Sequence, residues 1–167
     1  NIIQDSWMIK RTSREHVLKI LEDTQYGWNI LDIGCNRDAV MYAQTVADIQ
    51  DLSEFYKNKD KNFVLIEDKK LPFKDNQFDF IYASHVIEHV DDVAYFISEL
   101  QRISKKGYIE LPSKLEDNLV FENKKDHLWH MDFDDVNLRL LITNKIQVFE
   151  PILTVSSLQK LRKNFKS

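Results

Sequence analysis

Short apolar runs alternate with helix-like segments over the first two thirds of the chain, and this alternation constrains the fold more than any other feature. Each run is too short for a buried helix and stops at polar residues, which is typical of a buried strand. Strands that alternate with helices form a parallel sheet covered on both faces. We therefore predict an α/β, Rossmann-like, doubly wound and mostly parallel sheet. The predicted strands span residues 28–33, 44–49, 63–66, 78–83 and 108–111.

Helical patterns between these runs carry recognisable caps. Thr12 and Glu15 have the spacing of a capping box, in which each side chain accepts a hydrogen bond from the other's free amide. Asp91 or Asp92 can cap a later, strongly amphipathic helix, and Gly107 can end it with a left-handed turn. The predicted helices span residues 12–24, 52–57 and 91–104.

The last third of the chain allows two interpretations. Residues 128–133 and 136–142 alternate in polarity and predict an antiparallel C-terminal hairpin that turns at Asp134 and Asp135. A helix over residues 134–143 is the alternative. We further expect a strand at 146–149 and a final helix that is capped by Ser156 or Ser157 and reaches Phe165.

Size, charge and cysteine content limit the classes of protein. A length of 167 residues fits a single domain over 1–167. The formal net charge of −4 disfavours a nucleic acid partner. Cys35 is the one cysteine, so no intramolecular disulfide can form, and a reducing compartment fits. We see no signal peptide pattern and no apolar run long enough to span a membrane, and we expect a cytoplasmic protein.

Small and acidic residues follow the first predicted strand. In a doubly wound sheet, ligands bind beyond the carboxyl ends of the strands. Asp32 and Gly34 lie at such an end, where a glycine lets the backbone approach a ligand and an acid suits a cationic group. The chain has only three glycines, at 27, 34 and 107. The Gly-x-Gly-x-x-Gly loop of nicotinamide dehydrogenases is therefore excluded.

A longer set of motifs resembles a known family. Leu-Pro-Phe at 71–73, Phe-Asp at 78–79, Ser-His at 84–85 and Glu-His-Val at 88–90 occur in the order and spacing of class I S-adenosylmethionine-dependent methyltransferases of type 11. With the loop after the first strand, the resemblance extends over 30–113, about half the chain.

The resemblance implies a cofactor, S-adenosylmethionine, and a set of residues that bind it. Asp32 would lie near its amino group, above a loop of Gly34, Cys35 and Asn36. Asp48 would hold the ribose, Asp68 the adenine, and Ser84 with His85 would line the methionine end. The full predicted set is Asp32, Gly34, Cys35, Asn36, Asp48, Ile49, Asp68, Lys69, Leu71, Ser84 and His85.

The chain departs from the family pattern in its first loop. Asn36 and Asp38 stand where the family usually has glycine. Asparagine tolerates the left-handed conformation better than most residues, so Asn36 can replace glycine. Asp32 and Asp48 are close in sequence, and we expect the helix between them to be shortened to a turn or two.

A subgroup of the family suggests the acceptor. Gly-Tyr-Ile-Glu-Leu-Pro-Ser at 107–113 and His-Leu-Trp at 127–129 resemble methyltransferase-domain proteins of glycan and polysaccharide biosynthesis. The acceptor would then be a sugar or another small molecule. No insertion for a substrate lid is visible, so the acceptor could bind in an open cleft, or a second subunit of a homodimer could complete the site.

The histidines allow two functional hypotheses. His89 or His127 could act as the general base that removes a proton from the acceptor, with Glu88 orienting His89. Alternatively, His85 with His89 and His127 with His130 have spacings that permit metal binding. We expect no metal, since the sequence ties no third ligand to them.

We therefore predict S-adenosylmethionine-dependent methyl transfer to an oxygen or nitrogen atom. The lost glycines and the short first crossover support an alternative, a degenerate binding or scaffold module that keeps the fold without catalysis.

Overall fold

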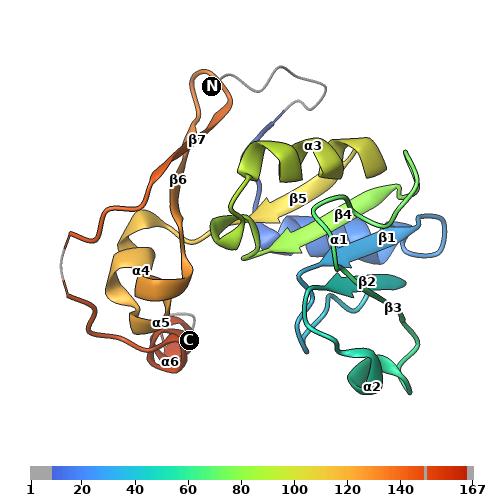
Figure 1. Ribbon diagram of the computed structural model, residues 1–167, viewed down its shortest axis with the longest axis horizontal. Coiled ribbons are helices and arrows are strands. Elements are labelled where there is room, and N and C mark those ends of the chain that lie inside the picture. Colours follow the sequence, from blue (N-terminus) through green and yellow to red (C-terminus); the bar gives the residue numbers. More distant parts are fainter. Residues whose placement is uncertain (1–8, 149, 165–167) are drawn as a thin grey trace. The chain divides into compact units, whose positions relative to one another are not determined.

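The computed structural model describes residues 9–148 and 150–164 (Figure 1). Their contacts form two compact units. The first, here called the sheet unit, contains the described residues up to Ile87 together with Asp92–Glu110. The second, the C-terminal unit, contains Glu88–Asp91 and the described residues from Leu111 onward. That the whole chain forms a single domain stays a prediction.

The sheet unit is built on five parallel strands in the order β3-β2-β1-β4-β5, which confirms the predicted fold class. The chain moves outward from β1 to β3 and then returns to place β4 on the other side of β1. The strand order thus reverses between β1 and β4, where folds of this type bind ligands. The strands are β1 (Ile30–Ile33), β2 (Thr45–Asp48), β3 (Asn62–Leu65), β4 (Phe80–Ser84) and β5 (Gly107–Glu110).

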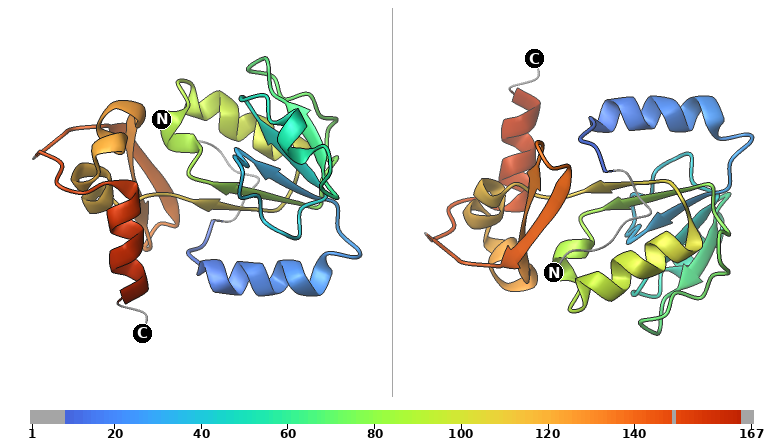
Figure 2. Two further views of the ribbon diagram at one scale, coloured as in Figure 1. Left: turned by 90° about the horizontal axis from the view of Figure 1, so that it is seen from below. Right: turned by 90° about the horizontal axis from the view of Figure 1, so that it is seen from above.

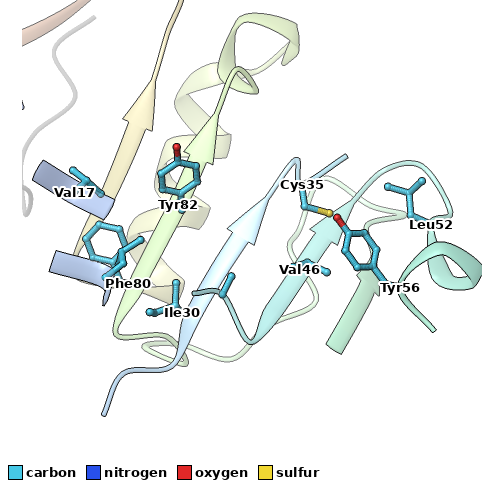
Figure 3. Packing of buried hydrophobic residues seen from close by; sticks show 10 residues of the cluster. Val17, Ile30, Cys35, Val46, Leu52, Tyr56, Phe80 and Tyr82 are labelled. Carbon is cyan, nitrogen blue, oxygen red and sulfur yellow. The ribbon is translucent and has the colours of Figure 1, made fainter. Parts of the chain in front are cut away.

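Helices cover both faces of this sheet (Figures 1 and 2). Helix α1 (Arg14–Thr24) packs on one face, where Val17 and Leu21 join the core cluster drawn in part in Figure 3. Helix α3 (Val93–Ile103) covers the other face through Leu100 and Ile103. Because side chains alternate along a strand, β1 supplies Ile30 to the first cluster and Leu31 to the second. A short helix, α2 (Ser53–Tyr56), lies between β2 and β3.

Several element ends differ from the sequence-based expectation. Ser13, rather than Thr12, caps α1, because its side chain accepts a hydrogen bond from the His16 amide at 3.2 Å. Asp92 caps α3 by accepting from the Tyr95 amide at 3.1 Å, one of the two expected choices. Gly107 makes no left-handed turn, since it is already the first residue of β5.

The connection from β1 to β2 contains no helix over residues 34–44, so the predicted short helix is wrong. The Lys61 ammonium stabilises this connection by donating to the carbonyl oxygens of Val40, Met41 and Ala43 at 3.2, 3.1 and 2.7 Å. A charged side chain thus satisfies carbonyl groups that helical hydrogen bonds would otherwise satisfy.

The C-terminal unit confirms the predicted hairpin and excludes the alternative helix. Strands β6 (Trp129–Asp134) and β7 (Arg139–Asn144) pair antiparallel. Their turn is tightened by Asp134, whose Oδ1 accepts from the Val136 and Asn137 amides, both at 3.0 Å. The predicted turn at Asp134 and Asp135 is therefore slightly too early.

Three helices complete this unit, and two of them were not predicted: α4 (Lys114–Leu119), α5 (Phe121–Asp126) and α6 (Val155–Asn164). Ser113 and Glu116 form a capping box at α4, a signal the sequence did contain. Thr154, not Ser156 or Ser157, caps α6 by accepting from the Ser157 amide at 3.2 Å.

The strand predicted at 146–149 is wrong for residues 146–148, which form no strand. Position 149 lies outside the described residues, as does Phe165, the expected end of the last helix. None of the described helices is long and apolar enough to cross a membrane.

Candidate functional site

The loop after β1 has a backbone that only particular residues can adopt. Gly34 has a φ of 71°, and a Cβ atom there would lie 2.3 Å from Cγ2 of Val86. The residue must therefore be glycine for both conformational and steric reasons. Asn36 has a φ of 43°, so the expected left-handed asparagine is confirmed. Gly34 and Cys35 both donate to the carbonyl oxygen of Ala47 in β2, at 2.8 and 3.3 Å.

Asp48, at the carboxyl end of β2, holds this loop. Its Oδ2 accepts from the Asn36 amide at 2.9 Å, and its Oδ1 accepts from the Gln50 amide at 3.0 Å. The Tyr56 hydroxyl donates to the Asn36 carbonyl at 2.6 Å. Each carboxylate oxygen can accept a second hydrogen bond, so Asp48 can bind the backbone and a diol together.

Asp32 is nearly buried in the neighbouring position at the end of β1, with 4% of its surface exposed. Its Oδ2 accepts from the Val40 amide at 2.7 Å. Burial raises the pKa of Asp32 to about 7, and the nearby carboxylates of Asp38 and Asp48 add to this increase. A cationic group placed beside Asp32 would stabilise its ionised form.

Cys35 has the surroundings of a packing residue, as expected. Its side chain is buried in the core cluster near Tyr56 (Figure 3). Burial raises the pKa of its thiol to about 12, so the reactive thiolate is scarce at neutral pH.

Ile49 and the three residues predicted around the adenine, Asp68, Lys69 and Leu71, fall in two different environments. Ile49 exposes 78% of its surface after β2, and Asp68 and Lys69 are exposed after β3. Leu71 is 2% exposed and belongs to the core cluster under α3. Its amide donates to the Glu99 carboxylate at 2.8 Å. Leu71 thus presents almost no surface to a ligand.

Ser84 ends β4 and His85 follows it, and both adjoin a residue that the sequence analysis missed. The Ser84 hydroxyl donates to Oε2 of Glu110 at 2.9 Å, and the His85 amide donates to the Glu110 carbonyl at 2.9 Å. His85 has a φ of 55°, a strained conformation for a residue with a side chain. Glu110 pairs with Ser84 across parallel strands, and that register could not be read from the sequence.

The histidines of the C-terminal unit form a cluster around Asp117, which is 1% exposed. His127 makes a hydrogen bond through Nδ1 to Oδ1 of Asp117, and His130 Nε2 lies 3.0 Å from Oδ2. The Lys145 ammonium lies 3.4 Å from the same Oδ2. Burial alone raises the pKa of Asp117, but the His127 hydrogen bond and the surrounding positive charges hold it below the usual value.

His89 lies next to His127 in this unit, with ring centroids 4.6 Å apart and nearly perpendicular planes. The sequence suggested other pairs, His85 with His89 and His127 with His130. The structure instead brings Glu88, His89 and His127 together, with one ligand-type atom of each within 4.8 Å of the others.

Comparison with known proteins identifies the family. Residues 16–109, more than half of the chain, match the family model described as a methyltransferase domain. The chain belongs to the methyltransferase domain family. This confirms the expected family and makes the matched region a domain of the S-adenosylmethionine-dependent methyltransferase class.

Two curated plant enzymes are similar to parts of this methyltransferase domain. Cycloartenol-C-24-methyltransferase of Arabidopsis thaliana is 28% identical over 116 residues, which cover 59% of this chain and 34% of the enzyme. Norajmaline N-methyltransferase of Rauvolfia serpentina is 34% identical over 83 residues, which cover 50% of this chain and 27% of the enzyme. The chain thus spans about a third or less of these relatives.

A solved structure supports the fold. A methyltransferase from Thermotoga maritima, described as S-adenosylmethionine-dependent and as a possible histamine N-methyltransferase, superposes with a TM-score of 0.51 and 14% identity. The match covers 88% of this chain and 67% of that one. At this identity the likeness concerns the fold alone.

Proposed function

We propose that this protein binds S-adenosylmethionine at the carboxyl ends of β1, β2 and β4 and transfers its methyl group to an oxygen or nitrogen of a small-molecule or sugar acceptor. The observation that supports this most is the loop of Gly34 and Asn36. Its left-handed turns and its hydrogen bond to Asp48 place bare backbone at the strand-order reversal of a methyltransferase domain.

The proposed roles follow from charge and position. Asp32 pairs with the cofactor's amino group, and Asp48 accepts hydrogen bonds from the ribose hydroxyls. Ile49, being exposed, packs on the adenine beside Asp68 and Lys69. Ser84 and His85 contact the methionine end. We keep Cys35 and Leu71 as supports of this surface, because each packs within an apolar core cluster.

Methyl transfer requires the protein mainly to position the two reactants. A lone pair of the acceptor attacks the methyl carbon, the carbon–sulfur bond breaks, and its electrons stay on sulfur to give S-adenosylhomocysteine. The sulfonium is already activated, so alignment of the two reactants supplies most of the catalysis. The acceptor's proton goes to a base or to water. His89 and His127 as that base stay a prediction.

The acceptor is the least constrained part of the proposal. The names of the relatives refer to cycloartenol and norajmaline, and they describe those enzymes only. Motifs at 107–113 and 127–129 favour a sugar acceptor in glycan biosynthesis. A homodimer that completes the acceptor site stays a prediction.

Calorimetric titration with S-adenosylhomocysteine tests cofactor binding. We expect binding in the micromolar range, and we expect Asp48→Ala to weaken it at least tenfold because it removes both the loop anchor and the ribose acceptor. Asp60→Ala is the matched control, since Asp60 is an exposed aspartate outside the site. Absence of heat from a folded sample would favour the degenerate module.

A further inference from the structure

Two segments of the C-terminal unit place three metal-ligand side chains side by side. Glu88 and His89 come from one segment, and His127 comes from the end of α5. The Leu128 amide donates to the Glu88 carbonyl at 2.8 Å, and the Trp129 indole donates to the Val90 carbonyl at 2.7 Å. The backbone around the cluster is therefore held together without any ligand.

Both histidines make a hydrogen bond through the same ring nitrogen, Nδ1. His89 Nδ1 lies 2.8 Å from the Asp126 carbonyl oxygen, which can only accept, so this nitrogen carries the hydrogen. His127 Nδ1 is hydrogen-bonded to the Asp117 carboxylate. In the neutral form of each ring, Nε2 then carries the lone pair that a metal ion needs. Proteins orient metal-binding histidines in this way, through a carbonyl or carboxylate on the other nitrogen.

Burial around the cluster favours a fixed site with one open side. Glu88 is fully buried, His127 is 8% exposed, and His89 is exposed. Asp117, which orients His127, is itself fixed by His130 and Lys145. An ion could enter from the side of His89, while burial limits the movement of Glu88 and His127.

We propose that Glu88, His89 and His127 bind a Zn²⁺ ion. Two imidazole nitrogens and one carboxylate oxygen form a ligand set that zinc favours, and they leave a fourth, tetrahedral position open to water or another ligand. Bond lengths of about 2.0–2.2 Å place tetrahedral ligand atoms roughly 3.4 Å apart. The ligand-type atoms now lie within 4.8 Å of one another, so ion binding requires side-chain rotations that bring them closer together.

This assignment changes the earlier expectation for the pair. When both Nε2 lone pairs bind the ion, His89 and His127 hold the metal and do not accept the acceptor's proton. The sequence-based expectation of no metal considered His85 with His89 and His127 with His130, and neither of those pairs is the one in the cluster.

Calorimetric titration of chelator-treated, dialysed protein with Zn²⁺ tests the site. We expect one ion per chain, and at least a roughly 100-fold loss of affinity in His89→Ala, because loss of an outer-sphere partner already costs 10–100-fold. His16→Ala is the matched control, since His16 is an exposed histidine of α1. Co²⁺ in place of Zn²⁺ should give the intense visible absorption of a tetrahedral ion, again lost in His89→Ala.

Two results would overturn the proposal: no saturable Zn²⁺ binding by the folded protein, or equal binding by the His89→Ala and His16→Ala variants. His89 is exposed, so its removal should leave the fold intact, and circular dichroism checks this. No S-adenosylhomocysteine is present in the experiment. Failure here is therefore separate from failure of the proposed methyltransferase activity.

Discussion

At the scale of single residues, the loop after β1 depends on a few positions that accept few types of residue. Gly34 has no room for a side chain, and Asn36 has a conformation that few other residues tolerate. Asp48 stabilises the loop by accepting a hydrogen bond from the Asn36 amide. Asp32 is constrained in another way, because its burial disfavours the negative charge with which it would attract a cofactor amine.

Asp32 makes stability depend on pH in a predictable direction. Its pKa is 3.8 in the unfolded chain and about 7 in the folded protein. Between these values the unfolded state releases its proton while the folded state keeps it, so stability falls as pH rises from about 4 to about 7. The Asn side chain of Asp32→Asn stays neutral. At pH 8 we expect the free energy of unfolding of this variant to exceed that of the wild type by up to about 4 kcal/mol, measured by urea denaturation.

The same variants measured at pH 4 provide the control, because wild type and Asp32→Asn should there differ little. Asp32→Asn should also lose affinity for S-adenosylhomocysteine at pH 8, where the negative charge matters. Parallel stability curves for the two proteins between pH 4 and 8 would contradict a buried, high-pKa Asp32.

At the scale of elements, the connection from β1 to β2 is the least regular part of the sheet unit. It contains no helix, and Lys61, which directly precedes β3, satisfies three of its carbonyl groups. A residue next to β3 thus stabilises a connection that comes earlier in the chain. The same connection contains Gly34 and Asn36.

Lys61→Ala should therefore destabilise the connection from β1 to β2. Loss of charge-assisted hydrogen bonds costs about 1.5–3 kcal/mol, and we expect a decrease of that size in the free energy of unfolding, with weaker S-adenosylhomocysteine binding. Lys19→Ala, at an exposed position of α1, is the matched control. Equal urea midpoints for the two variants would show that the loop holds its shape without Lys61.

Elements with strong local signals could be predicted, and those that depend on distant partners could not. Buried runs such as 78–83 and the α3 stripe need only their own sequence. By contrast, the irregular residues 34–44 receive hydrogen bonds from the distant Lys61, and the apolar pattern at 146–148 lies outside any sheet. The capping box at Ser113 was visible in the sequence and was overlooked.

The candidate site shows the same division. Asp32 and Asp48 lie at the carboxyl ends of β1 and β2, and Gly34 directly follows β1, so the fold class places them at one edge. Glu110 enters through strand register, and the Glu88–His89–His127 cluster forms from segments far apart in sequence. Contacts of this kind are tertiary and leave no local pattern.

At the scale of the whole molecule, the described residues form two compact units with separate chemistry. The sheet unit contains the predicted cofactor residues, and the C-terminal unit contains the histidine cluster. The proposed cofactor and the proposed metal ion can thus be tested independently. The chain spans about a third or less of its curated relatives, so both tests measure properties of this chain and not of proteins of the relatives' length.

Hydrogen exchange measured by mass spectrometry, with and without S-adenosylhomocysteine, tests the location of the cofactor most directly. A bound ligand slows exchange where it holds the backbone closed. We predict slower exchange in peptides that cover 34–50 and 67–71, with no change in peptides from β6 and β7. Unchanged exchange at 34–50 under saturating ligand, or protection confined to other segments, would contradict the account.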